Sequence, residues 1–227
     1  LCLQSKIVLT MTGLLILCGA VGFFLLEFNN PETMGDMNLL EKMTASLFQS
    51  VTTRTAGFAT VPQGDLRESS KLLGCMLMFI GGSPAGTAGG VKTTTIAMLL
   101  LTVLCVLKNK RDTECFARKI DNNIVRSGIT ITMITLIFLM SGITALTIFV
   151  TRNLISFDLT YEAASAMGTV GLTADLTPIL SRGSHVILMI LMYVGRIGPL
   201  TMALALSGRS DKISKFRELP EENVMLG

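Results

Sequence analysis

The sequence predicts an all-α membrane protein built from two tandem repeats, each with a long helix, a short helix followed by a loop, and a second long helix. Three observations predict this class. Half of the 227 residues are hydrophobic and only 15% are charged, with a mean hydropathy of +0.61, which exceeds the usual balance of a soluble domain. One uncharged run is too long to cross a membrane as a single helix. Long and short uncharged runs also recur in the same order twice along the chain.

The longest uncharged run covers residues 72–107 and is broken only by Lys92. As one straight helix this run would extend about 54 Å, whereas the hydrocarbon core of a bilayer is about 30 Å thick. The run must therefore break, and Pro84 with the glycines of residues 81–90 marks the place. Non-helical backbone at this depth is tolerated only where it is buried in protein or lines a water-filled cavity. The run therefore predicts a polar path through the membrane.

Three further runs are long enough to span a membrane. The first, 7–26, is not followed by a small-residue cleavage site, which favours a spanning helix over a signal peptide. The chain starts at Leu1, so we expect the numbering to begin inside a longer natural chain or at a processed start. The predicted spanning elements are 7–26, 70–107 with its interruption, 127–151 and 186–207, and the two runs too short to cross are 43–53 and 163–174. Runs of that length are typical of re-entrant or buried helices.

This order of runs indicates a duplicated unit. Aligning Gly57 with Gly171, 114 positions later, matches Thr-Ala-Gly-Phe to Thr-Val-Gly-Leu. We therefore expect four regions, which are a first repeat at 1–108, a linker at 109–126, a second repeat at 127–208 and a tail at 209–227.

Basic residues indicate which helix ends face the cytoplasm. Six lysines and arginines lie between residues 108 and 126, and four more lie in the tail from residue 209. Since short cytoplasmic loops are enriched in lysine and arginine, the linker and the tail are predicted to be cytoplasmic, and the short runs enter from outside. The acidic residues Asp158, Glu162 and Asp175 either concentrate cations at a pore mouth or belong to a solvated outer loop.

The loop after each short run has a composition suited to binding a dehydrated cation. Several carbonyl oxygens must point at one axis to replace the water around an alkali cation, and glycine reaches the required backbone conformations at low cost. Gly57 and Gly171 are placed for this role. The filter sequence of potassium channels begins Thr-Val-Gly, as residues 169–171 do. A ring of such loops needs about four contributors, so either two copies of the chain assemble or two further units lie upstream.

Four motifs can be compared with known families. They are Thr-Arg-Thr-Ala-Gly-Phe at 53–58, the glycine-rich stretch ending in Val-Lys-Thr-Thr-Thr at 81–95, Gly-Thr-Val-Gly-Leu-Thr at 168–173, and Gly-Arg-Ile-Gly-Pro-Leu-Thr at 195–201. Together they resemble the Trk/Ktr/HKT superfamily of potassium transporters, most of all its KtrB group, over essentially the whole chain. The family builds its pore from four M1–P–M2 units (helix, re-entrant pore helix with filter loop, helix), arranged like a potassium-channel tetramer. The resemblance implies that this chain is the C-terminal half, with units three and four.

The resemblance also implies an activity and partners. The family carries K⁺ inward across the bacterial plasma membrane, often with stimulation by Na⁺, as a homodimer on a cytoplasmic ring of nucleotide-binding KtrA-type subunits. We therefore expect a multi-pass protein in the lipid bilayer that is completed by the N-terminal half of the same native protein. We expect K⁺ as the transported ion, with neither an organic cofactor nor a nucleic-acid partner. Channel-like flow and ion-coupled transport are both compatible with this resemblance.

Site residues carry over from the family motif by motif. The implied K⁺ filter consists of the backbone carbonyls of Thr55, Ala56, Gly57, Phe58, Thr169, Val170, Gly171 and Leu172. The implied gate lies just below it and consists of Gly82, Ser83, Gly86, Thr87, Gly89, Gly90 and Arg196. An arginine near the bilayer midplane costs about 2.5–3.5 kcal/mol on insertion scales and is usually paired or faces water. We expect Arg196 to bond carbonyls of the 82–90 loop and hold the path shut; the alternative is that it only holds helices together.

Other functions agree less well with the sequence. A phosphate-binding loop needs lysine directly after glycine, but Val91 intervenes before Lys92, and we expect Lys92 to extend toward the inner surface. The apolar runs offer only Lys92 and Arg196 as titratable groups, and the five cysteines lack metal-ligand spacing, so we do not expect an enzyme. A structural membrane subunit that supports another pump or transporter remains the alternative.

Overall fold

The computed structural model describes residues 2–84, 86, 88–109, 114–115, 118–150 and 156–198. The predicted gate residue Thr87, the end of the last apolar run and the basic tail lie outside these residues.

The first half of the chain forms four helices, α1 (Leu3–Glu27), α2 (Leu39–Thr52), α3 (Glu68–Phe79) and α4 (Thr93–Leu107). α1 contains the first predicted spanning run, and α2 contains most of the first short run. α3 and α4 are the two parts of the interrupted run, and the break between them includes the whole glycine-rich stretch at 81–90. The prediction that this run must break is therefore confirmed.

The second half repeats the order with α5 (Asn122–Phe149), α6 (Ser156–Met167) and α7 (Arg182–Ile197). α5 begins before the predicted start at residue 127, because Asp121 caps it by accepting a hydrogen bond from the Asn123 backbone N–H. The end of the linker at 109–126 is thus helical.

The other described elements are short. The linker contains two antiparallel strands of two residues each, β1 (Glu114–Cys115) and β2 (Arg118–Lys119). A 3-10 turn at Thr177–Ile179 precedes α7. Within the described residues, all remaining elements are α-helices, in agreement with the predicted all-α class.

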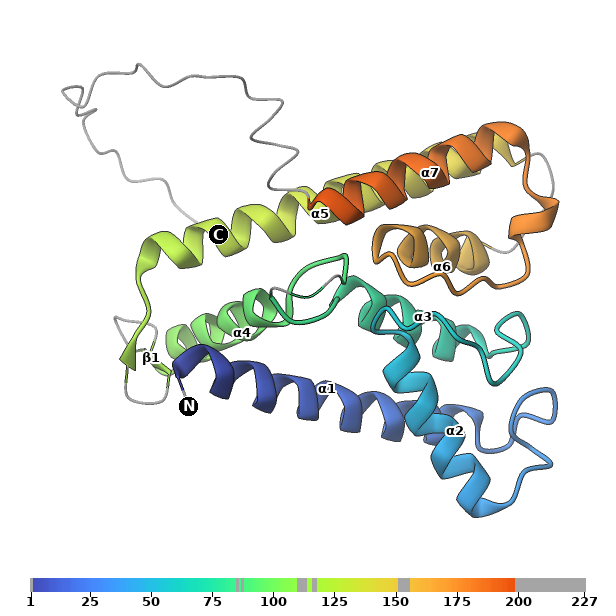
Figure 1. The fold of residues 1–227 in the computed structure, drawn as a ribbon, viewed down its shortest axis with the longest axis horizontal. Coiled ribbons are helices and arrows are strands. Elements are labelled where there is room, and N and C mark those ends of the chain that lie inside the picture. The colour runs from blue at the N-terminus through green and yellow to red at the C-terminus, as the bar shows by residue number, and fades with distance from the viewer. Residues whose placement is uncertain are drawn as a thin grey trace.

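The long helices α1, α4, α5 and α7 run along the long axis of the molecule (Figure 1). In that view the loops that follow α2 and α6 return to the right-hand end, whereas the linker between the halves lies at the left-hand end. Each short helix and its loop therefore start and finish at the same end of the molecule. α6 packs against α3, α5 and α7. This packing buries an apolar core that includes Leu139, Leu146, Leu159, Leu188 and Leu191.

Two of the described helices, α1 and α5, are long and apolar enough to cross a membrane, and α4 is apolar but shorter. Their surfaces carry large apolar side chains that the fold does not cover. Leu17 on α1 and Ile148 on α5, for example, are 65% and 74% exposed. Exposed apolar faces of this extent mark contacts with a membrane or with other protein.

Candidate functional site

Each short helix ends in a loop whose backbone alternates between two conformations. Thr55 and Gly57 after α2 have φ of 73° and 77°, and Thr169 and Gly171 after α6 have φ of 53° and 93°. The residue between each threonine and glycine has a negative φ. This alternation turns successive peptide planes so that their carbonyl oxygens can face one side. Positive φ was expected for the glycines, but for β-branched threonine it is a rare and strained conformation.

Local hydrogen bonds hold the first loop in this shape. The Thr52 carbonyl at the end of α2 accepts from the backbone N–H groups of Ala56 and Gly57, at 3.2 and 3.3 Å. The Thr52 hydroxyl donates to the Phe58 carbonyl at 2.6 Å and accepts from the Phe58 N–H at 2.9 Å. Among the predicted filter residues of this loop, Phe58 thus has its carbonyl engaged by the protein.

The two loops lie against each other. A Cβ atom added to Gly57 would be 2.2 Å from the Val170 carbonyl oxygen and 3.9 Å from the Gly171 Cα atom. A side chain at position 57 would collide with the second loop, so only glycine allows this approach. The structure thus brings the two predicted filter loops together, although they are 114 residues apart in the sequence.

The outer parts of the two loops differ in burial. Val170 and Leu172 are 5% and 3% exposed, and they belong to one apolar cluster with Met78 of α3 and Tyr161 of α6. Phe58, which aligns with Leu172, is 71% exposed. The second loop therefore packs on the preceding repeat, whereas the corresponding side of the first loop is uncovered.

The break between α3 and α4 is a closed loop. The Thr93 N–H at the start of α4 donates to the Gly82 carbonyl at 3.1 Å, which ties the two ends of the loop together. Ser83 and Gly86 form the turn at its tip, where the Gly86 N–H donates to the Ser83 carbonyl at 3.3 Å. Gly90, with φ of 68°, turns the chain back toward α4.

This loop contacts the second filter loop directly. The Gly89 N–H donates to the Thr169 hydroxyl at 3.0 Å, and a Cβ atom on Gly89 would lie 2.6 Å from the same oxygen. The Lys92 ammonium folds back and donates to the Ala88 carbonyl. The expectation that Lys92 extends toward the inner surface is therefore wrong, because a carbonyl of its own loop lies within reach.

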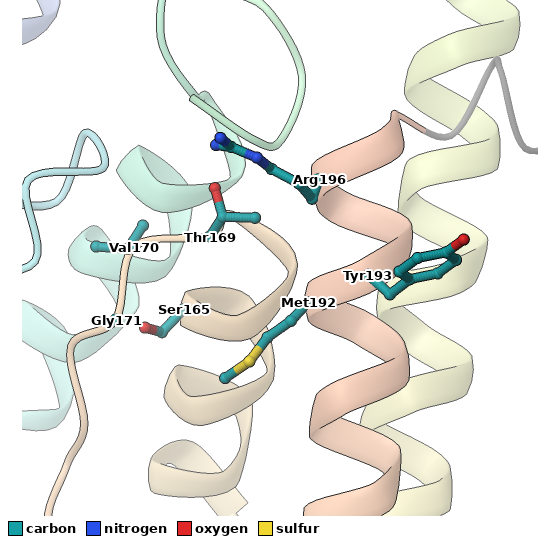
Figure 2. Close-up of a pocket in the computed structure, with 7 residues that line it drawn as sticks. All are labelled: Ser165, Thr169, Val170, Gly171, Met192, Tyr193 and Arg196. Atoms are coloured by element: carbon teal, nitrogen blue, oxygen red, sulfur yellow. The ribbon is translucent and has the colours of Figure 1, made fainter. Parts of the chain in front are cut away.

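Arg196 extends from the last turn of α7 toward this loop and toward Thr169 (Figure 2). α7 can approach because Gly195 has no side chain; a Cβ atom there would be 2.0 Å from the Met167 carbonyl oxygen at the end of α6. The positive charges of Arg196 and Lys92 are close enough to act on each other. A cavity of about 490 Å³ lies beside the second filter loop and is lined by Ser165, Thr169, Val170, Gly171, Met192, Tyr193 and Arg196.

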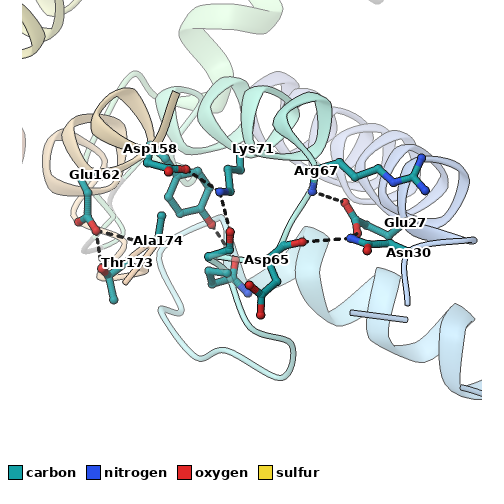
Figure 3. Close-up of polar contacts among 12 residues, drawn as sticks. Glu27, Asn30, Asp65, Arg67, Lys71, Asp158, Glu162, Thr173 and Ala174 are labelled. Atoms are coloured by element: carbon teal, nitrogen blue, oxygen red, sulfur yellow. Dashed lines mark hydrogen bonds and ion pairs between the residues drawn. The ribbon is translucent and has the colours of Figure 1, made fainter. Parts of the chain in front are cut away.

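Two acidic residues of α6 are held by the protein rather than by solvent (Figure 3). Asp158 forms an ion pair with Lys71 of α3 at 2.5 Å. Glu162 is 4% exposed and accepts hydrogen bonds from the Thr173 hydroxyl and, at 3.1 Å, from the Ala174 N–H. The expectation of a solvated outer loop is therefore wrong for these two side chains, whereas a role at a pore mouth stays a prediction.

Three buried polar side chains near the loops were not predicted. Gln49, Gln63 and Tyr161 have exposed fractions of 0%, 3% and 0%. Buried polar groups need hydrogen-bond partners. Two sequence signals could have indicated this polar network. They are Gln49 inside the short apolar run at 43–53 and Lys71 at the start of the longest run.

Comparison with protein families identifies relatives of the chain. A family model described as "TrkH: Cation transport protein" matches residues 1–216. The chain is 38% identical over 225 residues to "Ktr system potassium uptake protein B" of Bacillus subtilis (strain 168). It is 34% identical over 228 residues to "Potassium/sodium uptake protein NtpJ" of Enterococcus hirae. These alignments cover 99% of this chain but 49% and 50% of the two relatives, so the chain spans about half their length.

Among solved structures, the fold is similar to the crystal structure of the potassium transporter TrkH from Vibrio parahaemolyticus. The TM-score is 0.71 with 20% sequence identity, and the match covers 87% of this chain and 43% of that chain. At this identity the likeness concerns the fold alone. It agrees with the helical class predicted from the sequence.

Proposed function

Because the chain belongs to the TrkH family of cation transport proteins, we propose that it forms two M1–P–M2 units of a pore that conducts potassium into the cell. In the first unit, residues 1–108, M1 is α1, the pore helix is α2, and M2 is α3 with α4. In the second unit, residues 127–208, these roles belong to α5, α6 and α7. The linker at 109–126 and the tail at 209–227 are then cytoplasmic.

The observation that carries this proposal is the pairing of the two Thr-x-Gly loops. Both have threonine and glycine with positive φ on either side of a residue with negative φ, and their backbones approach so closely that Gly57 has no room for a side chain. Two turns that only terminate helices would not require such close contact between their backbones. A ring of carbonyl oxygens that replaces the hydration shell of K⁺ requires such a meeting.

In the proposed filter, K⁺ exchanges water for backbone oxygens of the two loops and of equivalent loops outside this chain. The residues assigned to this role are Thr55, Ala56, Gly57, Phe58, Thr169, Val170, Gly171 and Leu172. The bond from the Thr52 hydroxyl to the Phe58 carbonyl holds the outer end of the first loop, so that Phe58 shapes the filter more than it binds the ion.

The proposed gate is the loop between α3 and α4 together with Arg196. A permeating cation that leaves the filter meets the loop at Gly89, which is bonded to the filter threonine Thr169. It also meets the positive charge of Arg196, which points at this loop (Figure 2). Electrostatic repulsion from that charge opposes the passage of K⁺. The path opens when the loop, with its residues Gly82, Ser83, Gly86, Thr87, Gly89 and Gly90, moves away from the filter.

The relatives named above are about twice as long as this chain, and we propose that a preceding N-terminal half contributes two further units and completes the ring. The uncovered Phe58 supports this arrangement, since its counterpart Leu172 is buried against the preceding repeat. The word "system" in the name of one relative agrees with further subunits. We assign a homodimer in the bacterial plasma membrane that binds cytoplasmic nucleotide-binding subunits of the KtrA type, with Na⁺ as a stimulating ion.

Ion uptake by the full-length protein, reconstituted in vesicles of phosphatidylethanolamine and phosphatidylglycerol, tests the proposal. We expect uptake of a rubidium tracer that K⁺ and Rb⁺ inhibit more strongly than Na⁺ or Li⁺, because the filter replaces the larger ions' water more favourably. Protein-free vesicles are the control. No preference for K⁺ or Rb⁺ over Li⁺ would contradict a potassium filter, and no uptake at all would indicate a structural subunit.

A further inference from the structure

A buried polar network joins the two repeats on the outer side of the filter loops. It consists of Gln49 on α2, Gln63 in the loop before α3, Lys71 on α3, and Asp158 and Tyr161 on α6. We call these five residues the inter-repeat clamp. None of them belongs to the filter or the gate assigned above.

The first connection of the clamp runs through the amides. Gln49 and Gln63 exchange two hydrogen bonds, with Gln49 Nε2 donating at 2.6 Å and Gln63 Nε2 donating at 3.2 Å. The Tyr161 hydroxyl donates to the same Gln63 Oε1 atom at 2.7 Å. A continuous path of hydrogen bonds thus leads from the first pore helix to the second, across 98 residues of sequence between Gln63 and Tyr161.

The second connection is ionic and lies beside the first. Lys71 Nζ contacts Asp158 Oδ1 at 2.5 Å and also donates to the Gly64 carbonyl at 2.7 Å (Figure 3). The two side chains are only 7% and 13% exposed. Because separating a buried ion pair leaves an uncompensated charge, Lys71 ties α6 to the loop that follows the first filter loop.

Tyr161 contacts the second filter loop and also the segment that follows the first filter loop. Its ring packs in the cluster that contains Val170 and Leu172 of the second loop, while its hydroxyl holds Gln63 in the segment after the first loop. The ring can cross α3 because residue 74 is glycine; a Cβ atom there would be 3.0 Å from Tyr161 Cε2. A shift of Tyr161 would therefore move the two loops relative to each other.

From this arrangement we propose that Tyr161, with the rest of the inter-repeat clamp, sets the spacing of the two filter loops and so determines how strongly K⁺ is preferred over Na⁺. The inference rests on the proposed filter function. Cation preference depends on the geometry and number of the carbonyl oxygens around the ion. The two backbones already touch at Gly57 and Val170, so a small change of spacing alters that geometry. Tyr161 acts through the loops and is a positioning residue.

The substitution Tyr161→Phe tests this role without leaving a buried polar group unpaired. Gln63 Oε1 keeps its hydrogen bond from Gln49, so we expect the variant to fold. The test measures uptake into vesicles by the full-length protein and compares the KM for Na⁺ with the KM for K⁺. We expect the ratio of these two KM values to fall by about tenfold. That factor corresponds to the loss of one buried hydrogen bond of about 1.4 kcal/mol.

Ser46→Ala is the matched control. Ser46 is a buried hydroxyl on the first pore helix, 1% exposed, and it donates to the Lys42 carbonyl in its own helix at 2.7 Å. Its loss should lower the amount or the thermal stability of the protein without changing the KM ratio. A clamp residue with a merely structural role would behave in the same way.

Asp158→Asn provides the second variant, because it weakens the ionic connection and leaves the amide path intact. We expect the same direction of change in the KM ratio, and this variant decides the question if Tyr161→Phe does not accumulate. A wild-type KM ratio in the folded Tyr161→Phe protein would overturn the inference while wild-type K⁺ uptake still supports the proposed function. Absence of selective uptake by the wild-type protein would overturn both.

Discussion

At the scale of single residues, the two filter threonines carry conformational strain. Thr55 and Thr169 have positive φ, which costs an L-residue about 1–2 kcal/mol. Such strain persists only where the surroundings enforce it. Thr52 enforces it in the first loop through the bonds to its carbonyl and its hydroxyl, and the Gly89 N–H binds the hydroxyl of Thr169. Protein contacts therefore hold the loops of the proposed filter in this strained shape.

The two filter glycines should respond differently to alanine. Gly57→Ala places a Cβ atom 2.2 Å from the Val170 carbonyl oxygen, whereas Gly171→Ala meets nothing within 4 Å and adds only the strain of positive φ, about 1–2 kcal/mol. We expect Gly57→Ala to abolish selective uptake and Gly171→Ala to reduce selectivity by about tenfold. Tracer uptake with Na⁺ competition measures both.

Gly13→Ala is the control for these variants. Gly13 lies inside α1 with open space around it, where alanine favours the helix by about 0.5–1 kcal/mol, so selectivity should not change. Selective uptake by Gly57→Ala equal to that by Gly13→Ala would contradict the close approach of the loops.

At the scale of elements, a buried carboxylate ties α1 to α3 at the outer end of the first repeat. Glu27 is fully buried and accepts hydrogen bonds from Asn30 Nδ2 and Thr33 Oγ1, both at 2.6 Å, and from the Arg67 N–H at 3.0 Å. A carboxylate can accept all of these bonds at once. The Glu27 carboxylate thus caps the start of α3 through the Arg67 N–H. Through α3 it also helps to position the proposed gate loop.

Glu27→Gln should destabilise the protein without changing ion preference. The amide nitrogen would face a donor, so one buried group loses its partner at a cost of about 1–3 kcal/mol. We expect a lower midpoint of thermal unfolding in detergent and an unchanged ratio of Na⁺ to K⁺ affinity. The exposed Glu32 offers the control Glu32→Gln, which should leave the midpoint within error. An unfolding midpoint equal to that of the wild type would show that Glu27 is not a cap.

The gate loop and α7 act as one element in the proposed mechanism. A unit charge about 8 Å from a permeating cation opposes it by about 2 kcal/mol at an effective dielectric constant of about 20. Arg196→Ala should therefore raise K⁺ flux by about tenfold or more, as measured by the initial rate of tracer uptake. Arg182→Ala removes the same charge from the exposed start of α7 and should not raise the rate. Flux through Arg196→Ala no faster than wild type would mean that Arg196 only holds helices together.

At the scale of the whole molecule, the two repeats are equivalent in order but not in burial. α6 and its loop pack on α3 of the preceding repeat, and by the same rule α2 and its loop should pack on a repeat that precedes this chain. The apolar side chains on α2 agree, since Leu40 and Met43 are 74% and 59% exposed. Protein surface of this kind is covered in the complete assembly or faces lipid.

Phe58 distinguishes a covered surface from one that is exposed to water. In the full-length protein with its native cysteines replaced, we expect Phe58→Cys to resist a water-soluble thiol reagent, because a preceding repeat covers it as α3 covers Leu172. Phe28→Cys, at a position that is 37% exposed at the outer end of α1, should react within the same time. Rapid labelling at position 58 would argue against a preceding repeat at this surface.

Local features of the sequence determined the helical class, the order of long and short helices, the break between α3 and α4, and the two glycine bends. Length, hydropathy and glycine content act within a few residues, and the thickness of a bilayer converts run length into structure. Only the tertiary structure decided that the threonines adopt positive φ, that Lys92 binds Ala88, and that Asp158 and Glu162 are held inside the protein. The Asp158–Lys71 pair joins segments that are 87 residues apart, whereas Lys92 and Glu162 bind groups 4 to 12 residues away that the folded loops bring within reach. A buried polar group takes whichever partner the fold brings within reach.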